Sequence, residues 1–301
     1  MIEINNIIKS YDDHTALKGL SLSMRENELF GMVGTNGAGK TTLMRIMTGI
    51  MKADSGEVQI DGLPVWDNPA AKQLFFFIPE EPYFFPNCRP RNMAEYYAGI
   101  YENFSMEHFL EMMGRFGLDL GRRVNGYSKG MKRQLAIILG LSARTKYLFC
   151  DETFDGLDPV MRQATKSLMA QAMEDRGLAT VLTSHNLREL EDVCDHVGLL
   201  HQGGVLLSEN LDDLKLGVQK LQVVFESEED RQAAEQQLAI MDHRTQGRLH
   251  VYTVRQSAAE TEGVMKGAKT VWFELLPLTL EEIFISETEV VGYDIQKIIG
   301  E

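Results

Sequence analysis

Cysteine is scarce in this 301-residue chain, and its three cysteines are far apart. Cys88, Cys150 and Cys194 form no C-x-x-C pair, and an odd number cannot be fully paired in disulfides. This spacing argues against a disulfide framework and against a zinc site. We therefore expect the three side chains to pack in the interior of a protein that folds in a reducing cytoplasm.

Long apolar runs are missing as well. No stretch approaches the ~20 apolar residues that cross a bilayer. The start, Met1-Ile2-Glu3-Ile4, lacks the basic and then apolar character of a signal peptide. The sequence thus predicts no direct membrane insertion and no secretion. Basic residues are also outnumbered, with 30 Lys and Arg against 44 Asp and Glu and a formal net charge of −14. Because nucleic acid attracts proteins through its phosphates, we expect no nucleic-acid partner.

The hydrophobic pattern predicts an α/β protein. Helical patterns separate apolar runs that read as strands, an order typical of a mostly parallel sheet that binds ligands at the carboxyl ends of its strands. Residues 1–33 favour further strands, and residues 92–141 are mostly helical. The length favours one large domain with a smaller one. The expected core strands are residues 29–33, 75–78, 147–150, 179–182 and 197–200.

A glycine-rich turn, Gly34-Thr35-Asn36-Gly37-Ala38-Gly39-Lys40-Thr41, matches G-x-x-x-x-G-K-[ST] in full. It lies between an apolar run and a helical pattern, so successive backbone N–H groups can converge on phosphate oxygens at a helix N-terminus. A chance lysine in a turn would not explain this order. The motif predicts that Lys40 contacts the β- and γ-phosphates and that the Thr41 hydroxyl binds Mg²⁺. The predicted phosphate-binding residues are Asn36, Gly37, Ala38, Gly39, Lys40, Thr41 and Thr42.

Two carboxylates follow the apolar run 147–150. In P-loop nucleotidases the first carboxylate helps to hold Mg²⁺, which is the role predicted for Asp151. A second carboxylate beside the γ-phosphate can deprotonate the attacking water, the role predicted for Glu152. On its own the pair would be read as a solvated acidic turn. Lys40 upstream favours the catalytic interpretation.

Together with four further motifs, the phosphate loop and the carboxylate pair resemble the nucleotide-binding subunit of ABC transporters, in family order from about residue 2 to 215. Tyr127-Ser128-Lys129-Gly130-Met131 stands at the position of the L-S-G-G-Q signature, and Gly156-Leu157-Asp158 at that of the D-loop. His185 is similar to the switch histidine and Tyr11 to the aromatic that stacks on adenine. Each of these four motifs alone also fits a structural role: a helix N-cap, a turn, a strand-end histidine or a surface aromatic.

The resemblance implies roles for these residues. Ser128 and Gly130 would contact the γ-phosphate of an ATP bound to a second subunit, and Asp158 would also belong to the nucleotide site. His185 would hydrogen-bond the γ-phosphate and hold the geometry of the catalytic carboxylate. Glu80 stands where the family has glutamine, and a carboxylate there can still bind Mg²⁺ and water while adding negative charge near the γ-phosphate.

The other departures from the family pattern do not replace any of these site residues. Tyr127 and Lys129 replace Leu and Gly of the signature, and Thr153-Phe154 replaces Pro-Thr after the carboxylates. We therefore expect an active ATPase with ATP and Mg²⁺ as cofactors. Three rivals remain: a soluble ABC ATPase not coupled to transport, an ATP-binding regulatory module with little turnover, and a small-molecule kinase that shares the P-loop alone.

The fold implied by the resemblance is an α/β P-loop NTPase core with an antiparallel β subdomain and a helical subdomain at about residues 82–145. This nucleotide-binding domain would span residues 1–218. The implied function is ATP-driven transport, with export preferred, through a separate transmembrane permease subunit. A second nucleotide-binding subunit would complete a homo- or heterodimer, cytoplasmic and peripheral on the inner face of the cell membrane. Tyr83, Phe84 and Phe85 are candidates for the permease contact, or for packing beneath the helical subdomain.

Residues 219–301 contain no catalytic motif and predict a small α+β accessory domain. We expect strands at 221–225, 249–254 and 270–274 and helices at 230–241 and 258–265. A further apolar helix should begin at Thr279, with Glu281 and Glu282 in its first turn. This domain is predicted to regulate the ATPase or to support its dimer.

Overall fold

The computed structural model describes residues 1–35, 37–154 and 157–290. The chain divides into two compact units, Met1–Ser208 and Glu209–Glu301, so the division falls slightly before the predicted boundary at residues 218 and 219. Asn36 and Gly156, both named in the predicted site, lie outside the described residues. In the described part of the chain, no helix is both long enough and apolar enough to cross a bilayer.

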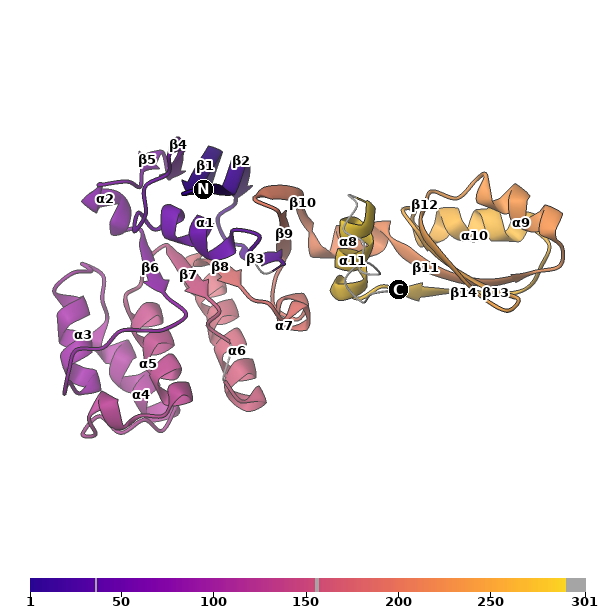
Figure 1. The fold of residues 1–301 in the computed structure, drawn as a ribbon. Coiled ribbons are helices and arrows are strands. Elements are labelled where there is room, and N and C mark those ends of the chain that lie inside the picture. Colours follow the sequence, from indigo (N-terminus) through magenta and orange to yellow (C-terminus); the bar gives the residue numbers. More distant parts are fainter. Residues whose placement is uncertain (36, 155–156, 291–301) are drawn as a thin grey trace. The chain divides into compact units, whose positions relative to one another are not determined.

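A six-stranded sheet forms the centre of the first unit (Figure 1). Pairings β6 to β7, β7 to β8, β8 to β3 and β3 to β9 are all parallel, as the alternation of strands and helices predicted. Because these strands are covered on both faces, they read as continuous apolar runs. In sheet order the strands are β10 (Gly204–Asn210), β9 (His196–His201), β3 (Leu29–Gly34), β8 (Ala179–Thr183), β7 (Tyr147–Asp151) and β6 (Phe75–Ile78).

A second, antiparallel sheet packs against the first. Its strands, in sheet order, are β2 (His14–Met24), β1 (Ile2–Tyr11), β4 (Ser55–Ile60) and β5 (Leu63–Pro64). Alternate apolar residues such as Ile2 and Ile4 point into a core that also contains Phe149 of β7 and Val181 of β8. Helix α1 (Lys40–Met47) contributes Leu43 to the same core. Burial of these side chains fixes the start of α1 relative to the end of β3.

The remaining helices of this unit include a group beside β6 and β7 (Figure 1). Helix α5 approaches the sheet closely at Gly140, where a Cβ atom would lie 3.0 Å from Leu148 Cδ1 and 3.1 Å from Phe76 Cδ1. The predicted helical region is therefore divided into separate helices and anchored on the sheet through α5. The helices are α2 (Pro69–Lys72), α3 (Pro90–Ala98), α4 (Met106–Arg115), a 3₁₀ turn at Val124–Gly126, α5 (Lys129–Ser142), α6 (Pro159–Arg176) and α7 (Leu187–Glu191).

The second unit is an antiparallel sheet covered by helices. Its order is β12 (Ile240–Gln246), β13 (Leu249–Val254), β11 (Gln219–Phe225) and β14 (Thr270–Pro277). Ala234 of α9 and Met265 of α10 pack against Leu221 and Tyr252, so these helices cover the same face of the sheet. The helices of this unit are α8 (Leu211–Gly217), α9 (Glu228–Glu235), α10 (Ala258–Gly267) and α11 (Leu280–Val290).

The end of one predicted helix in this unit is wrong, and the start of another is confirmed. The helix expected at residues 230–241 is present but runs from Glu228 to Glu235, and residues 240–246 form the edge strand β12, which pairs with β13. Pairing with a neighbouring strand overrides helix propensity there. Helix α11 begins as predicted: the Thr279 hydroxyl accepts a hydrogen bond from the Glu282 N–H at 3.2 Å.

Candidate nucleotide-binding site

The phosphate loop joins β3 to α1 through two glycines with left-handed backbone. Gly37 has a φ of 79° and Gly39 a φ of 100°. At Gly39 a Cβ atom would lie 2.6 Å from Leu17 Cδ2 and 2.9 Å from the Ala16 carbonyl oxygen, so a side chain cannot be accommodated. The glycines therefore let the loop turn tightly and bring its backbone N–H groups to the start of α1.

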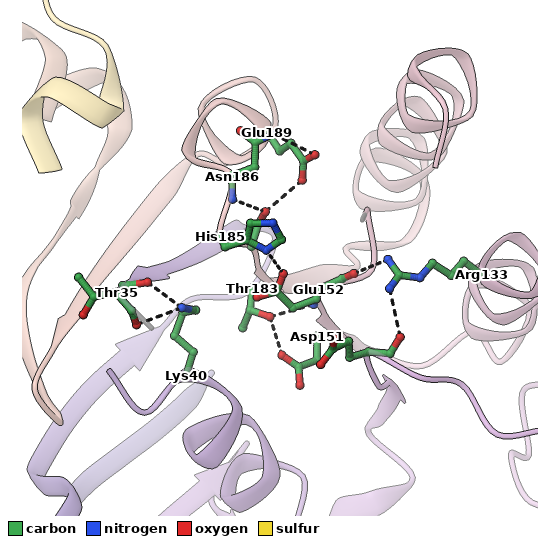
Figure 2. A network of polar contacts seen from close by, with 12 residues as sticks. Thr35, Lys40, Arg133, Asp151, Glu152, Thr183, His185, Asn186 and Glu189 are labelled. Carbon is green, nitrogen blue, oxygen red and sulfur yellow. Dashed lines mark hydrogen bonds and ion pairs between the residues drawn. The ribbon is translucent and has the colours of Figure 1, made fainter. Parts of the chain in front are cut away.

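Lys40, the first residue of α1, is folded back over this loop (Figure 2). Its ammonium group donates to the carbonyl oxygen of Gly34 at 2.7 Å and to that of Thr35 at 3.5 Å. Burial lowers the pKa of Lys40, and the nearby Glu152 and Asp151 carboxylates oppose this shift. A buried cation bound to neutral carbonyl oxygens is well placed to exchange them for phosphate oxygens, which are stronger acceptors.

A cavity of about 340 Å³ opens over the loop. It brings together residues predicted from separate motifs, including the adenine-stacking candidate and the catalytic carboxylate. Tyr11 is 41% exposed, and its hydroxyl lies 3.4 Å from Thr42 Oγ1. The predicted residues that line the cavity are Tyr11, Gly37, Ala38, Gly39, Lys40, Thr41, Thr42 and Glu152.

Asp151 ends β7 as a buried carboxylate that is 3% exposed. One of its oxygens accepts a hydrogen bond from the Thr183 hydroxyl at 2.6 Å. Burial raises the pKa of Asp151, the Thr183 hydrogen bond counteracts this, and the Glu152 and Glu80 carboxylates raise it further. Such a crowded anion is stabilised by a cation, and Asp151, Thr41 and Glu80 supply the oxygen donors that Mg²⁺ prefers.

Asp151, Thr41 and Glu80 would fill only part of the coordination shell of Mg²⁺, so other ligands would complete it. Among the described residues, no group of three or more His, Cys, Asp or Glu side chains could hold a metal ion by itself. Mg²⁺ is commonly bound by one or two carboxylates, waters and the phosphates of its substrate. The residues present therefore fit an ion that arrives with a nucleotide.

Glu152 has an unusual backbone, with a φ of 50°. Non-glycine residues seldom adopt this left-handed conformation, which costs on the order of 1–3 kcal/mol and persists only where neighbours impose it. Here the Glu152 N–H donates to the Thr183 hydroxyl at 3.0 Å and to the Thr183 carbonyl oxygen at 3.2 Å. The backbone is thus held at the end of β8 while the side chain lines the cavity.

The two predicted catalytic residues are in contact. His185 Nδ1 lies 2.6 Å from Glu152 Oε2 (Figure 2). His185 follows the end of β8, the strand beside β7, so parallel pairing places both loops at one edge of the sheet. A carboxylate fixed by a histidine beside a phosphate-binding loop can act on a water molecule at the terminal phosphate.

Comparison with known proteins identifies the family. Residues 17–155 match the family model described as ABC transporter. The ABC transporter ATP-binding protein YtrB of Bacillus subtilis (strain 168) is 31% identical over 95% of this chain and 98% of its own length. The bacitracin transport ATP-binding protein BcrA of Bacillus licheniformis is 30% identical over 71% of either chain. The chain belongs to the ABC transporter ATP-binding proteins.

Solved structures agree on the fold. An ATP-binding subunit of an ABC transporter superposes with a TM-score of 0.66 at 25% identity, over 71% of this chain and 92% of that one. A dimeric bacterial ABC transporter cassette superposes with a TM-score of 0.62 at 22% identity, over 70% of this chain and 99% of that one. The predicted family, P-loop NTPase fold and activity are confirmed: this is an ATP-binding ATPase that couples to transport.

In this ABC ATPase, the signature residues do not line the cavity described above. The exposed Ser128 caps α5, accepting a hydrogen bond from the Met131 N–H at 3.2 Å, with Gly130 in the first turn. The exposed Asp158 caps α6 through the Met161 N–H at 2.9 Å. Tyr127, which departs from the family pattern, is buried and donates to the Asp119 carbonyl oxygen at 2.7 Å. The tyrosine therefore stabilises the turn before the signature and leaves Ser128 accessible.

Sequence reasoning missed a buried carboxylate behind His185. Glu189 is 6% exposed; it accepts from the Ser184 hydroxyl at 3.0 Å and from the Asn186 side chain at 3.2 Å (Figure 2). The Glu189 carboxylate also forms an ion pair with Arg162 of α6 at 3.0 Å. A glutamate in the first turn of a helix is an ordinary complement to the helix dipole, so the sequence carried no specific signal for this network.

Proposed function

We propose that this ATPase works as one of two nucleotide-binding subunits, paired head to tail beside a separate membrane-spanning permease. The observation that carries the proposal is the division of the predicted nucleotide contacts over two surfaces. Lys40, Glu152 and Tyr11 line one cavity, whereas Ser128 lies exposed at the start of α5. In a head-to-tail pair, each ATP lies between Lys40 of one subunit and Ser128 of the other.

In this arrangement ATP is part of the subunit interface. Backbone N–H groups of the phosphate loop and of the α5 N-terminus approach the same γ-phosphate from opposite sides. ATP thus favours the closed pair, and hydrolysis followed by product release allows it to open. The pair is a homodimer or a heterodimer, cytoplasmic and peripheral to the membrane through the permease.

Each site residue of one subunit then has a separate role in ATP hydrolysis. Lys40 binds the β- and γ-phosphates, and Glu152 takes a proton from the attacking water. His185 holds the Glu152 carboxylate in place and donates to the γ-phosphate. Thr41, Asp151 and Glu80 would hold Mg²⁺, which neutralises charge on the phosphates when bound.

The permease contact is proposed at a second cavity, of about 630 Å³, beside the helical region. Aromatic side chains from the segment after β6 line it, and Tyr83 is 70% exposed. The Phe85 ring packs edge-on against Tyr83 at 6.1 Å and Tyr96 at 4.9 Å between centroids. The cavity is also lined by Thr41, Glu80 and Asp151, so a permease helix seated here would adjoin the magnesium ligands.

The proposed direction of transport is export. It is supported by relatives named for antimicrobial compounds, such as the bacitracin transport protein BcrA and the lantibiotic transport protein SrtF of Streptococcus pyogenes. A multi-span membrane protein encoded in a neighbouring reading frame would be the candidate permease, and co-expression with it tests the assignment. We expect the two to purify together and ATP turnover to rise in the complex. Equal turnover with and without the partner, and no co-purification, would favour an uncoupled ATPase.

The second unit is proposed as an accessory domain that supports the dimer or its coupling. All the residues predicted for the nucleotide site belong to the first unit. A truncated protein of residues 1–217 keeps β10 and α8 complete, and we expect it to bind ATP as the full chain does. Dimer formation with ATP or stimulation by the permease should change instead.

Equilibrium titration with ATP and size-exclusion chromatography distinguish these effects, after circular dichroism has established that the truncated protein is folded. A folded truncation that no longer binds ATP as a monomer would contradict this division of labour.

A further inference from the structure

Arg133 of α5 is a fully buried arginine that contacts two active-site segments. Its side chain is 1% exposed. Nη1 donates to the carbonyl oxygen of Glu152 at 2.7 Å, and Nη2 donates to the carbonyl oxygen of Glu80 at 3.3 Å (Figure 2). One guanidinium group therefore connects α5 to the segment after β7 and to the segment after β6. A buried charge is costly unless it is hydrogen-bonded, and these two hydrogen bonds lower that cost.

The contact with Glu152 acts on a strained residue. The left-handed backbone of Glu152 is held on its amide side by Thr183. Arg133 holds the same residue on its carbonyl side. With both peptide groups fixed, the side chain of Glu152 leaves the backbone in one direction and meets His185.

The same helix carries the signature residues. Ser128 is the N-cap of α5, and Arg133 lies further along the helix. Near its other end, Gly140 allows α5 to pack closely on β6 and β7. Because an α-helix is stiff over this length, a displacement of Ser128 is transmitted to the Arg133 side chain and to the carbonyl groups that it binds.

We propose that Arg133 is a positioning residue for ATP hydrolysis: it fixes the backbone of Glu152 and of Glu80 and links both to the signature helix. The proposal rests on the assignment of Glu152 as the general base. It means that the contact of Ser128 with the nucleotide of the second subunit also sets the catalytic geometry of the subunit that carries Ser128. An arginine suits this role because its planar guanidinium offers separate donors in fixed directions, whereas lysine offers one compact ammonium.

The test compares Arg133→Met and Arg133→Lys with Arg115→Met in the full chain. Arg115 lies on α4, is exposed and pairs with Glu111, so its replacement removes the same charge without touching an active-site segment. For Arg133→Met we expect ATP affinity and KM like those of the wild type. We expect kcat to fall by about 10- to 100-fold, as displaced catalytic groups produce. Arg133→Lys keeps the charge and one contact, so its kcat should be intermediate. Arg115→Met should match the wild type.

Thermal unfolding, ATP titration and steady-state kinetics are measured on each variant. A folded Arg133→Met protein with wild-type kcat would overturn the proposal, as would a loss of ATP affinity equal to the loss of kcat. If Arg133→Met does not fold, Arg133→Lys decides: a wild-type kcat in that variant overturns the positioning role. Glu152→Gln, measured in parallel, separates the two assumptions. Wild-type turnover in Glu152→Gln would overturn the assignment of Glu152 as the general base. Slow turnover in Glu152→Gln together with wild-type turnover in folded Arg133→Met would overturn the positioning role of Arg133 alone.

Discussion

Replacing Glu152 by glutamine is expected to leave ATP bound and to slow its hydrolysis by roughly 10²-fold or more, the effect of losing a positioned general base. Glutamine has nearly the same shape, and the backbone bonds to Thr183 and Arg133 do not depend on the side chain. The contact with His185 can also be kept, because an amide can hydrogen-bond to an imidazole. The substitution therefore removes the proton acceptor and leaves the binding surface in place.

The same variant should accumulate as an ATP-bound dimer, because the step that permits reopening is blocked. Phosphate release measures the first effect, and size-exclusion chromatography with ATP measures the second. Glu174→Gln is a matched control, since Glu174 is an exposed residue of α6 that undergoes the same change of charge. Wild-type turnover in Glu152→Gln would exclude Glu152 from the chemical step.

Lys40→Ala and Ser128→Arg are expected to fail at different stages. Lys40 is buried and folded back over the phosphate loop, so alanine removes a charge-assisted contact from the monomer site. Hydrogen bonds of this kind contribute about 1.5–3 kcal/mol, which corresponds to an affinity for ATP lowered by roughly 10- to 100-fold. Ser128 is exposed and does not line that cavity, so arginine there should leave monomer binding unchanged and block closure of the pair.

Nucleotide titrations at protein concentrations too low for dimer formation measure ATP binding to the monomer. Dimerisation with ATP in a Glu152→Gln background measures closure of the pair. Lys72→Ala, an exposed lysine of α2, controls for loss of positive charge. Equal loss of monomer affinity in Lys40→Ala and Ser128→Arg would contradict a site shared between two subunits.

The sequence was enough to predict those parts of the site whose function depends on residues that are adjacent in the chain. The glycine-rich turn with Lys40 and the pair Asp151-Glu152 each carry their chemistry within a few residues. The resemblance to ABC transporters implied that His185 holds the Glu152 carboxylate, and His185 Nδ1 lies 2.6 Å from Glu152 Oε2.

Other parts of the site could not be predicted, because their partners are far apart in the chain. Nothing in the sequence near Arg133 indicates that it donates to Glu152 and Glu80, which depends on how closely α5 packs on the sheet. The role of Thr183, which hydrogen-bonds both Asp151 and Glu152, depends on the register of β7 against β8. The end of the helix predicted at 230–241 was wrong for a related reason, since residues 240 and 241 belong to β12, which is stabilised by pairing with β13.

The order β3, β8, β7, β6 determines how the active site is spaced. Neighbouring strands lie about 4.8 Å apart, so the phosphate loop, His185, the carboxylate pair and Glu80 follow one another in equal steps along one edge of the sheet. Distances along the chain have no influence on these steps. An insertion in the helices between β6 and β7 therefore leaves the spacing unchanged, whereas a slip of one residue in β7 would turn Asp151 towards the opposite face.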